Sequence, residues 1–155
     1  MHSRLVVSLL CASALAFACG PLTRATEVRG EPAVQRAAAD TTTRNVAASL
    51  DVQVGPTVKF SLGMANVGDH RVEVDFPSGQ THELVVLDAA GREVWRWSTG
   101  RLFTQTVQTR LLSTGESTQF SERWKPGSLR GSFTVVASLR SDNHPIELRR
   151  GFTLE

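Results

Sequence analysis

From Leu50 to Leu154 the chain is a succession of short segments in which apolar and polar residues alternate, and each segment ends at a turn signal. The clearest covers residues 58–64, where Val, Phe, Leu and Met alternate with Lys, Ser and Gly. A period of two residues places the apolar side chains on one face of a β-strand, whereas an amphipathic helix needs a period of 3.6. No helical period emerges over this range, so the sequence predicts an all-β domain.

The middle of the chain predicts a hairpin. Residues 81–87 carry branched apolar side chains on both faces, which indicates a strand inside a packed sheet. Residues 88–91 read Asp-Ala-Ala-Gly, a composition typical of a tight turn, and the chain returns through residues 92–98. Trp95 and Trp97 lie two residues apart on the return strand, so their indoles are expected to share one face.

Further strands are expected along the rest of the domain, near residues 50–54, 58–64, 72–76, 103–112, 117–124, 133–139 and 146–154. Val107 and Leu111 are expected to face the core, and Arg150 with Gly151 is expected to form a bulge in the last strand. Together with the hairpin, this spacing is typical of an immunoglobulin-like antiparallel β-sandwich of about 7–9 strands.

The first residues predict export. Residues 1–4 are short and positively charged, and residues 5–18 form an apolar stretch of signal-peptide length. Cys19 follows Ala18 directly, as in a bacterial lipobox, whose cysteine receives a diacylglycerol. We therefore expect a signal peptide over residues 1–18, with lipidation of Cys19 anchoring the protein to the cell membrane or the outer membrane. Plain secretion, into the periplasm or beyond it, is the alternative.

Residues 19–45 predict a flexible tether, because large apolar side chains are scarce there. The folded domain is then expected over residues 46–155. The formal net charge of +2 gives no reason to expect a nucleic-acid partner. The chain has two cysteines, Cys11 and Cys19, so the domain is expected to contain no disulfide.

No motif of catalytic or metal chemistry stands out. The histidines have no metal-ligand spacing, and His70 and His144 are expected to be solvated loop residues. There is no G-x-S-x-G elbow, no phosphate-binding loop and no dinucleotide-binding glycine pattern. Four central carboxylates are expected on wet faces or in turns: Asp75, Glu83, Asp88 and Glu93. The sequence thus predicts a protein that is not an enzyme, with no catalytic residues, no metal and no cofactor.

The triplet Trp95, Arg96 and Trp97 is a candidate binding surface, since Trp and Arg are enriched in interface hot spots. The alternative is that both indoles belong to the core, where each would bury a large area.

The loop that follows, residues 98–104, is the second candidate. Gly100 is expected to adopt a positive φ, and Arg101 and Phe103 follow it. The loop resembles a segment that an inhibitor inserts into a proteinase cleft, where Arg101 would suit a trypsin-like acidic pocket. An ordinary connection between strands is the alternative.

Four stretches together resemble the BsuPI type of domain, named for an intracellular proteinase inhibitor: FPSGQ at 76–80, DAAGREVWRWSTGRLFTQ at 88–105, LLSTGES at 111–117 and WKPG at 124–127. The resemblance covers roughly residues 58–137 and implies a sandwich fold and proteinase inhibition.

We therefore expect a non-enzymatic, envelope-anchored domain that binds another protein. Inhibition of a serine protease is the specific form that the resemblance implies, with membrane contact through the lipid on Cys19. The alternative function is a structural or assembly module of a cell-envelope complex, docking through an edge strand.

Overall fold

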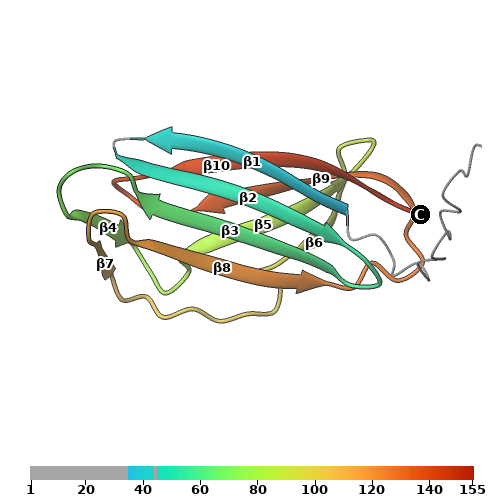
Figure 1. The fold of residues 1–155 in the computed structure, drawn as a ribbon. Helices are drawn as coiled ribbons and strands as arrows, with labels where there is room; N and C mark the ends of the chain where they lie inside the picture. The colour runs from blue at the N-terminus through green and yellow to red at the C-terminus, as the bar shows by residue number, and fades with distance from the viewer. Residues whose placement is uncertain (1–34, 44) are drawn as a thin grey trace, which may run out of the picture. The chain divides into compact units, whose positions relative to one another are not determined.

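The fold is known from a computed structural model that describes residues 35–43 and 45–155, with side chains from residue 45 onward. The predicted signal peptide and Cys19 lie outside these residues. The described residues contain no helix and form ten strands (Figure 1): β1 (Gln35–Thr43), β2 (Val46–Val54), β3 (Val58–Asn66), β4 (Val72–Phe76), β5 (His82–Asp88), β6 (Glu93–Arg96), β7 (Gln108–Leu112), β8 (Ser117–Trp124), β9 (Gly131–Leu139) and β10 (Ile146–Leu154).

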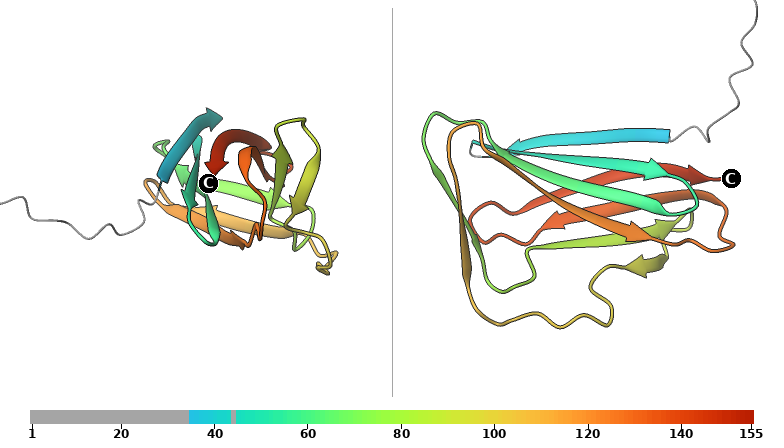
Figure 2. Two further views of the ribbon diagram at one scale, coloured as in Figure 1. Left: turned by 90° about the vertical axis from the view of Figure 1, so that its right-hand side faces the viewer. Right: turned by 60° about the horizontal axis from the view of Figure 1, so that its bottom comes forward.

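Two four-stranded antiparallel sheets lie face to face (Figure 2). The first has the order β1-β2-β3-β8, and the second has the order β10-β9-β5-β6. Strands β4 and β7 pair separately as a two-stranded sheet. The predicted all-β sandwich is therefore confirmed, and β5 is an interior strand of its sheet, as its two apolar faces indicated.

The core between the sheets is built around Phe60 of β3. Its ring lies 5.8 Å from the ring of Trp95 on the opposite sheet and 5.8 Å from that of Phe152. Trp124 completes the group, with its ring centroid 6.2 Å from that of Trp95. Phe60 is fully buried, and aromatic contacts at these distances add to the energy of apolar burial. This cluster joins β6 and β10 to the facing sheet.

The hairpin between β5 and β6 closes through Asp88, as its turn residues predict. The Asp88 carboxylate accepts hydrogen bonds from the backbone N–H groups of Ala90 and Arg92, each at 2.9 Å. These bonds and the Arg92 side chain hold the pKa of Asp88 below its ordinary value. Gly91 has a φ of 77°, a conformation that suits glycine.

The β-bulge lies elsewhere than predicted. The register between β5 and β6 shifts between Val86 and Leu87, whereas β10 pairs with β9 without interruption from Ile146 to Leu154. The expected bulge at Arg150 and Gly151 was therefore wrong, because the long partner strand β9 continues the regular ladder through them.

The predicted strand over residues 103–112 is shorter in the structure. Only β7 is a strand, and it pairs with β4 alone. Val107 is 68% exposed and Leu111 is 47% exposed, so their expected inward orientation was wrong. Leu112, opposite Val72 of β4, is the buried residue of β7, so this strand meets the core only at its last residue.

Strand β1 lies within the range predicted as a tether. It pairs with β2 along its whole length, from Gln35 opposite Val54 to Thr43 opposite Val46. An edge strand is held largely by backbone hydrogen bonds, so its sequence needs few large apolar residues. Residues 35–43 therefore lack the alternating large apolar residues from which a strand is predicted.

Candidate functional site

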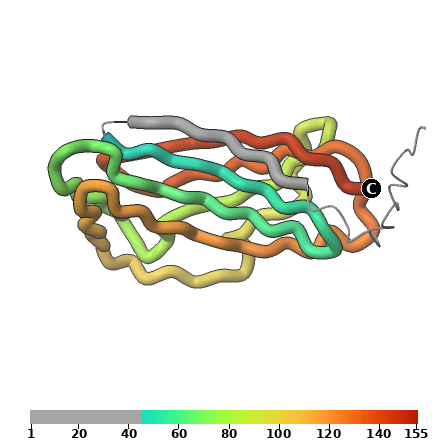
Figure 3. The backbone as a smooth tube through the Cα atoms, in the orientation of Figure 1, coloured from blue at the N-terminus to red at the C-terminus, as the bar shows by residue number. Residues whose placement is uncertain are grey.

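The segment between β6 and β7, residues 98–107, leaves the sheets and is called here the display loop. It follows a path outside the two sheets before entering β7 (Figures 1 and 2), and the tube in Figure 3 shows it without interruption. Ion pairs and hydrogen bonds at its two ends connect it to β8, through Arg101 near Glu122 and through Arg110, just beyond the loop, on Thr118. The loop therefore flanks the edge of the first sheet.

Leu102 is the most exposed large apolar residue among those described, with 99% of its surface accessible. Its two neighbours both point back to the protein. Arg101 donates from Nε to the carbonyl oxygen of Trp97 at 2.9 Å, and the Phe103 ring lies 5.4 Å from the Trp97 ring. The chain thus alternates inward, outward and inward over three residues, and it presents Leu102 to solvent.

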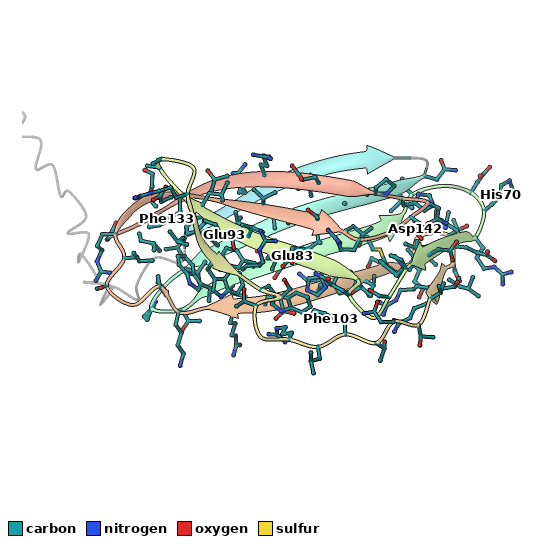
Figure 4. All side chains as sticks on the ribbon, turned by 180° about the vertical axis from the view of Figure 1, so that it is seen from behind. His70, Glu83, Glu93, Phe103, Phe133 and Asp142 are labelled. Atoms are coloured by element: carbon teal, nitrogen blue, oxygen red, sulfur yellow. The ribbon has the colours of Figure 1, made fainter. Side chains whose placement is uncertain are left out.

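The far side of the display loop is fastened by Gly79, in the turn after β4. The backbone N–H of Gly79 donates to the Thr104 carbonyl oxygen at 2.8 Å. A Cβ atom at position 79 would lie 2.5 Å from Thr104 Oγ1, so any other residue there would force the Thr104 side chain to move. Phe103, labelled in Figure 4, lies on the loop between the two fastened points.

Beneath Trp97 lies a buried histidine. The His82 ring stacks between Trp97 and Phe120, with ring centroids 4.1 and 4.7 Å away. Its Nε2 lies 3.3 Å from Glu122 Oε1, and the other Glu122 oxygen lies 3.8 Å from Arg101. Burial lowers the pKa of His82, although the Glu122 carboxylate acts in the opposite direction.

Pattern analysis missed this histidine, although a signal was present. His82 alternates with Leu84 and Val86, both of which face the core, so the period of β5 also turns His82 inward. Because histidine is polar, His82 was not counted among the inward-facing residues of this strand.

A buried carboxylate anchors the start of the display loop from the outer face of the second sheet. Glu83 accepts hydrogen bonds from the Ser98 hydroxyl and, at 3.2 Å, from the Ser98 backbone N–H. Gln80 donates a further bond, and an Arg96 nitrogen lies 3.5 Å from the Glu83 carboxylate. The expectation that Glu83 is solvated was wrong, because the loop folds over it; Glu83 and Glu93 are labelled in Figure 4.

The candidate site residues divide into core and loop. Trp95 packs between Phe60 and Trp124, and Trp97 is 8% exposed, so both indoles belong to the core. Arg96 projects from the opposite face and pairs with Glu93.

In the loop, Gly100 has a φ of 74° and occupies an open turn. Arg101 folds over the Trp97 ring, 4.6 Å from its centroid, instead of projecting outward. Leu102, which pattern reasoning passed over, is the projecting residue.

The remaining expectations concern histidines, metals and membranes. His144 is buried and was expected to be solvated; its backbone N–H bonds to Ser141 Oγ, which ties the β9–β10 turn together. Over residues 35–43 and 45–155, no group of three or more His, Cys, Asp or Glu side chains is arranged to hold a metal ion. In the same residues, no helix has the length and apolar character needed to cross a membrane.

The solved structures that match this chain are distant. A β-glucosidase from Erythrobacter marinus matches with 16% identity over 77% of this chain and 16% of its own, at a TM-score of 0.37. The putative ApaA protein from Bordetella pertussis matches with 16% identity over 78% of this chain and 89% of its own, also at 0.37. A β-glucosidase from Listeria innocua matches with 9% identity over 79% of this chain and 16% of its own, at 0.35. The chain thus spans about a sixth of the glucosidases, and a search of curated proteins finds no match.

A family model described as intracellular proteinase inhibitor, BsuPI, matches residues 45–144. This description contradicts the predicted export, and with it the predicted location at a membrane or in the periplasm, so that prediction is corrected. The apolar stretch at residues 5–18 led to it through composition alone.

The match runs from the residue before β2 to the turn before β10 and includes the whole display loop. It extends over well more than half of the chain. The chain therefore belongs to the BsuPI family of intracellular proteinase inhibitors.

Proposed function

We propose that this protein inhibits a proteinase through the display loop, with Leu102 entering the pocket that normally receives a substrate side chain. The observation that carries the proposal is the full exposure of Leu102 between two fastened neighbours, Arg101 and Phe103. The family description supports inhibition in general and gives no residue.

The backbone of the display loop supports the same function. Proteinases bind their substrates as extended strands, through main-chain hydrogen bonds with pockets for alternate side chains. Within the described chain, the N–H groups of Leu102 and Phe103 and the carbonyl of Leu102 take part in no backbone hydrogen bond. These groups are available to the cleft of a partner.

Anchoring at both ends supports tight binding. A segment already held in its bound conformation loses less conformational freedom on association, which raises affinity without new contacts. Glu83 holds Ser98, Trp97 holds Phe103, and Gly79 holds Thr104. The loop is thereby ordered before any partner arrives.

The residue that projects from the display loop decides which proteinases the protein is expected to inhibit. An apolar side chain suits an apolar primary pocket, whereas a trypsin-like acidic pocket needs a cation. Arg101 does not supply that cation in an outward position, because its guanidinium lies over Trp97 and near Glu122. The proposed partner is therefore a serine proteinase that prefers large apolar residues.

Titration of the full chain against a panel of serine proteinases tests this function. We expect stoichiometric inhibition of a chymotrypsin-like enzyme and little effect on trypsin. Cleavage of the chain between Leu102 and Phe103 without a fall in proteinase activity would make it a substrate and overturn the proposal. A stable complex with a protein that is not a proteinase would favour the assembly-module alternative.

A further inference from the structure

A recess lies beside the display loop, where the sandwich opens between β6 and β8. This recess, called here the edge pocket, has a volume of about 510 Å³. Its lining includes the side chains of Glu93, Trp95, Arg96, Trp97, Arg101 and Arg123. Arg101 lines the edge pocket and also lies in the display loop, directly before Leu102.

The charge of the edge pocket is unbalanced. Arg96 is neutralised by Glu93 and lies near Glu83. Arg101 has a single distant carboxylate, Glu122, at 3.8 Å. Arg123 forms no ion pair with any carboxylate of the described residues.

Arg123 also violates the usual pairing of charges in a sheet. It lies directly opposite Lys59 of β3, on the outer face of the first sheet. Like charges in directly opposed positions destabilise a sheet. Natural sequences break such a local rule mainly at functional sites, so the placement of Arg123 indicates a role in binding.

Trp97 contributes a further unsatisfied group. Its indole Nε1–H is buried and has no hydrogen-bond partner among the described residues. Buried polar groups are nearly always paired, so an unpaired donor beside the pocket favours an acceptor group nearby. The Arg101 side chain covers this ring and keeps that position while it presents Leu102.

We propose that the edge pocket binds a carboxylate side chain of the proteinase whose cleft receives Leu102. This inference rests on the proposed function and adds that the partner is acidic next to its cleft. Guanidinium groups recognise carboxylates through paired hydrogen bonds, which Arg123, with no carboxylate partner among the described residues, can supply. Arg101, whose nearest carboxylate is Glu122 at 3.8 Å, adds positive charge beside it.

The first test compares two variants that each remove one exposed arginine from an edge strand. Arg123→Ala changes the edge pocket, and Arg149→Ala changes β10, where Arg149 pairs with Glu147. We expect Arg123→Ala to slow association with the inhibited proteinase about 3- to 10-fold at low salt, and this effect to vanish near 0.5 M salt. Arg149→Ala should leave the rate unchanged. Equal rates for the two variants would overturn the inference.

The second test needs no proteinase and separates the inference from the proposed function. A blocked pentaglutamate peptide is titrated into the full chain at low salt, and tryptophan fluorescence is followed, since Trp95 and Trp97 line the pocket. A saturable change that Arg123→Ala abolishes and Arg149→Ala retains supports the pocket even if no proteinase is inhibited. If no proteinase is inhibited and the unmodified chain gives no fluorescence change, the inference is overturned as well.

Discussion

Arg101 and Trp97 are joined twice: the guanidinium carbon lies 4.6 Å from the centre of the indole, and Arg101 Nε donates to the Trp97 carbonyl oxygen at 2.9 Å. The pair bends the chain back onto the core directly before Leu102. A residue that local sequence presents as an exposed cation is therefore a clamp, and the apolar residue after it is the one that solvent and a partner meet.

Substitution of Leu102 should weaken inhibition strongly without affecting the fold. For Leu102→Ala we expect the inhibition constant to rise by about 30-fold or more, because truncation of a hot-spot residue costs about 2 kcal/mol or more. The unfolding free energy should change by less than about 0.5 kcal/mol, since the side chain is solvated. Steady-state inhibition and urea unfolding measure the two quantities.

Leu129→Ala is the matched control, because Leu129 is also an exposed leucine in a loop, at 39% accessibility, and lies between β8 and β9. It should inhibit like the unmodified chain. If both leucine variants weaken inhibition equally, the display loop is not the contact.

Gly79→Ala should detach the far end of the display loop. Its Cβ would collide with Thr104 Oγ1 at 2.5 Å, and overpacking of this kind costs about 1–3 kcal/mol. The double variant Gly79→Ala, Thr104→Ala removes that oxygen and should recover part of the loss. Chemical denaturation of the single and double variants measures the coupling.

Gly55→Ala serves as the comparison for Gly79→Ala, because the nearest atom to its Cβ, the Thr57 carbonyl oxygen, lies 3.7 Å away. It should cost little. A Gly79→Ala variant as stable as Gly55→Ala would contradict the close approach of the loop.

Acidification should destabilise the protein through His82. Its pKa is lower in the folded state than the ordinary value of 6.5, mainly because burial disfavours the cation. The unfolded chain therefore binds more protons, so stability is full above about pH 6.5 and falls as the pH drops toward the folded pKa. The charged groups that face the ring are Glu122, whose carboxylate acts against the effect of burial, together with Glu83 and Arg101.

The variant His82→Phe keeps an aromatic ring between Trp97 and Phe120 and removes the titration. Its unfolding free energy should vary less between pH 7.5 and pH 5 than that of the unmodified chain. His70→Gln, at an exposed loop residue, should keep the original pH dependence. Parallel curves for the His82 variant and the unmodified chain would show that the stacked histidine plays no part.

Removal of the Glu83 side chain should release the start of the display loop. In Glu83→Ala the Ser98 N–H and hydroxyl lose their acceptor, and unsatisfied buried donors cost about 1–3 kcal/mol. We expect lower stability and faster amide hydrogen exchange at Ser98 and the residues after it. Glu83→Gln keeps one acceptor oxygen, so its stability and its exchange rate at Ser98 should lie between those of Glu83→Ala and those of the unmodified chain. Exchange at Ser98 that matches the unmodified chain would contradict an anchoring role.

The fold was largely predictable because its signals are local. The period of two residues in β3 and β9 follows from side chains pointing alternately to the two faces of a strand, which no distant contact needs to specify. The turn at residues 88–91 was equally predictable, because Asp88 accepts a hydrogen bond from the backbone of the turn and Gly91 supplies its positive φ. The same alternation allowed the indoles of Trp95 and Trp97 to be weighed as core residues.

The display loop was less legible, and the reason is physical. Residues 98–104 were expected to be a loop, but residues from 103 onward were expected to form a strand, and a strand differs from a loop there only by having a neighbour to pair with. Strand β7 finds β4, while residues 101–107 find no strand, and that outcome depends on chain segments far away in sequence. Composition likewise pointed to export, which the family description contradicts.

By itself, the sequence determined the strand periods and the turns, because these depend on neighbouring residues along the chain. Tertiary structure alone decided that the His82 ring is enclosed between Trp97 and Phe120, that Glu83 is buried, that Arg101 turns back onto Trp97, and that Leu102 projects. Each of these outcomes depends on a partner brought close by folding: Phe120, Ser98 and the core beneath the loop. Side-chain exposure is a property of the packed molecule, and no local pattern specifies it.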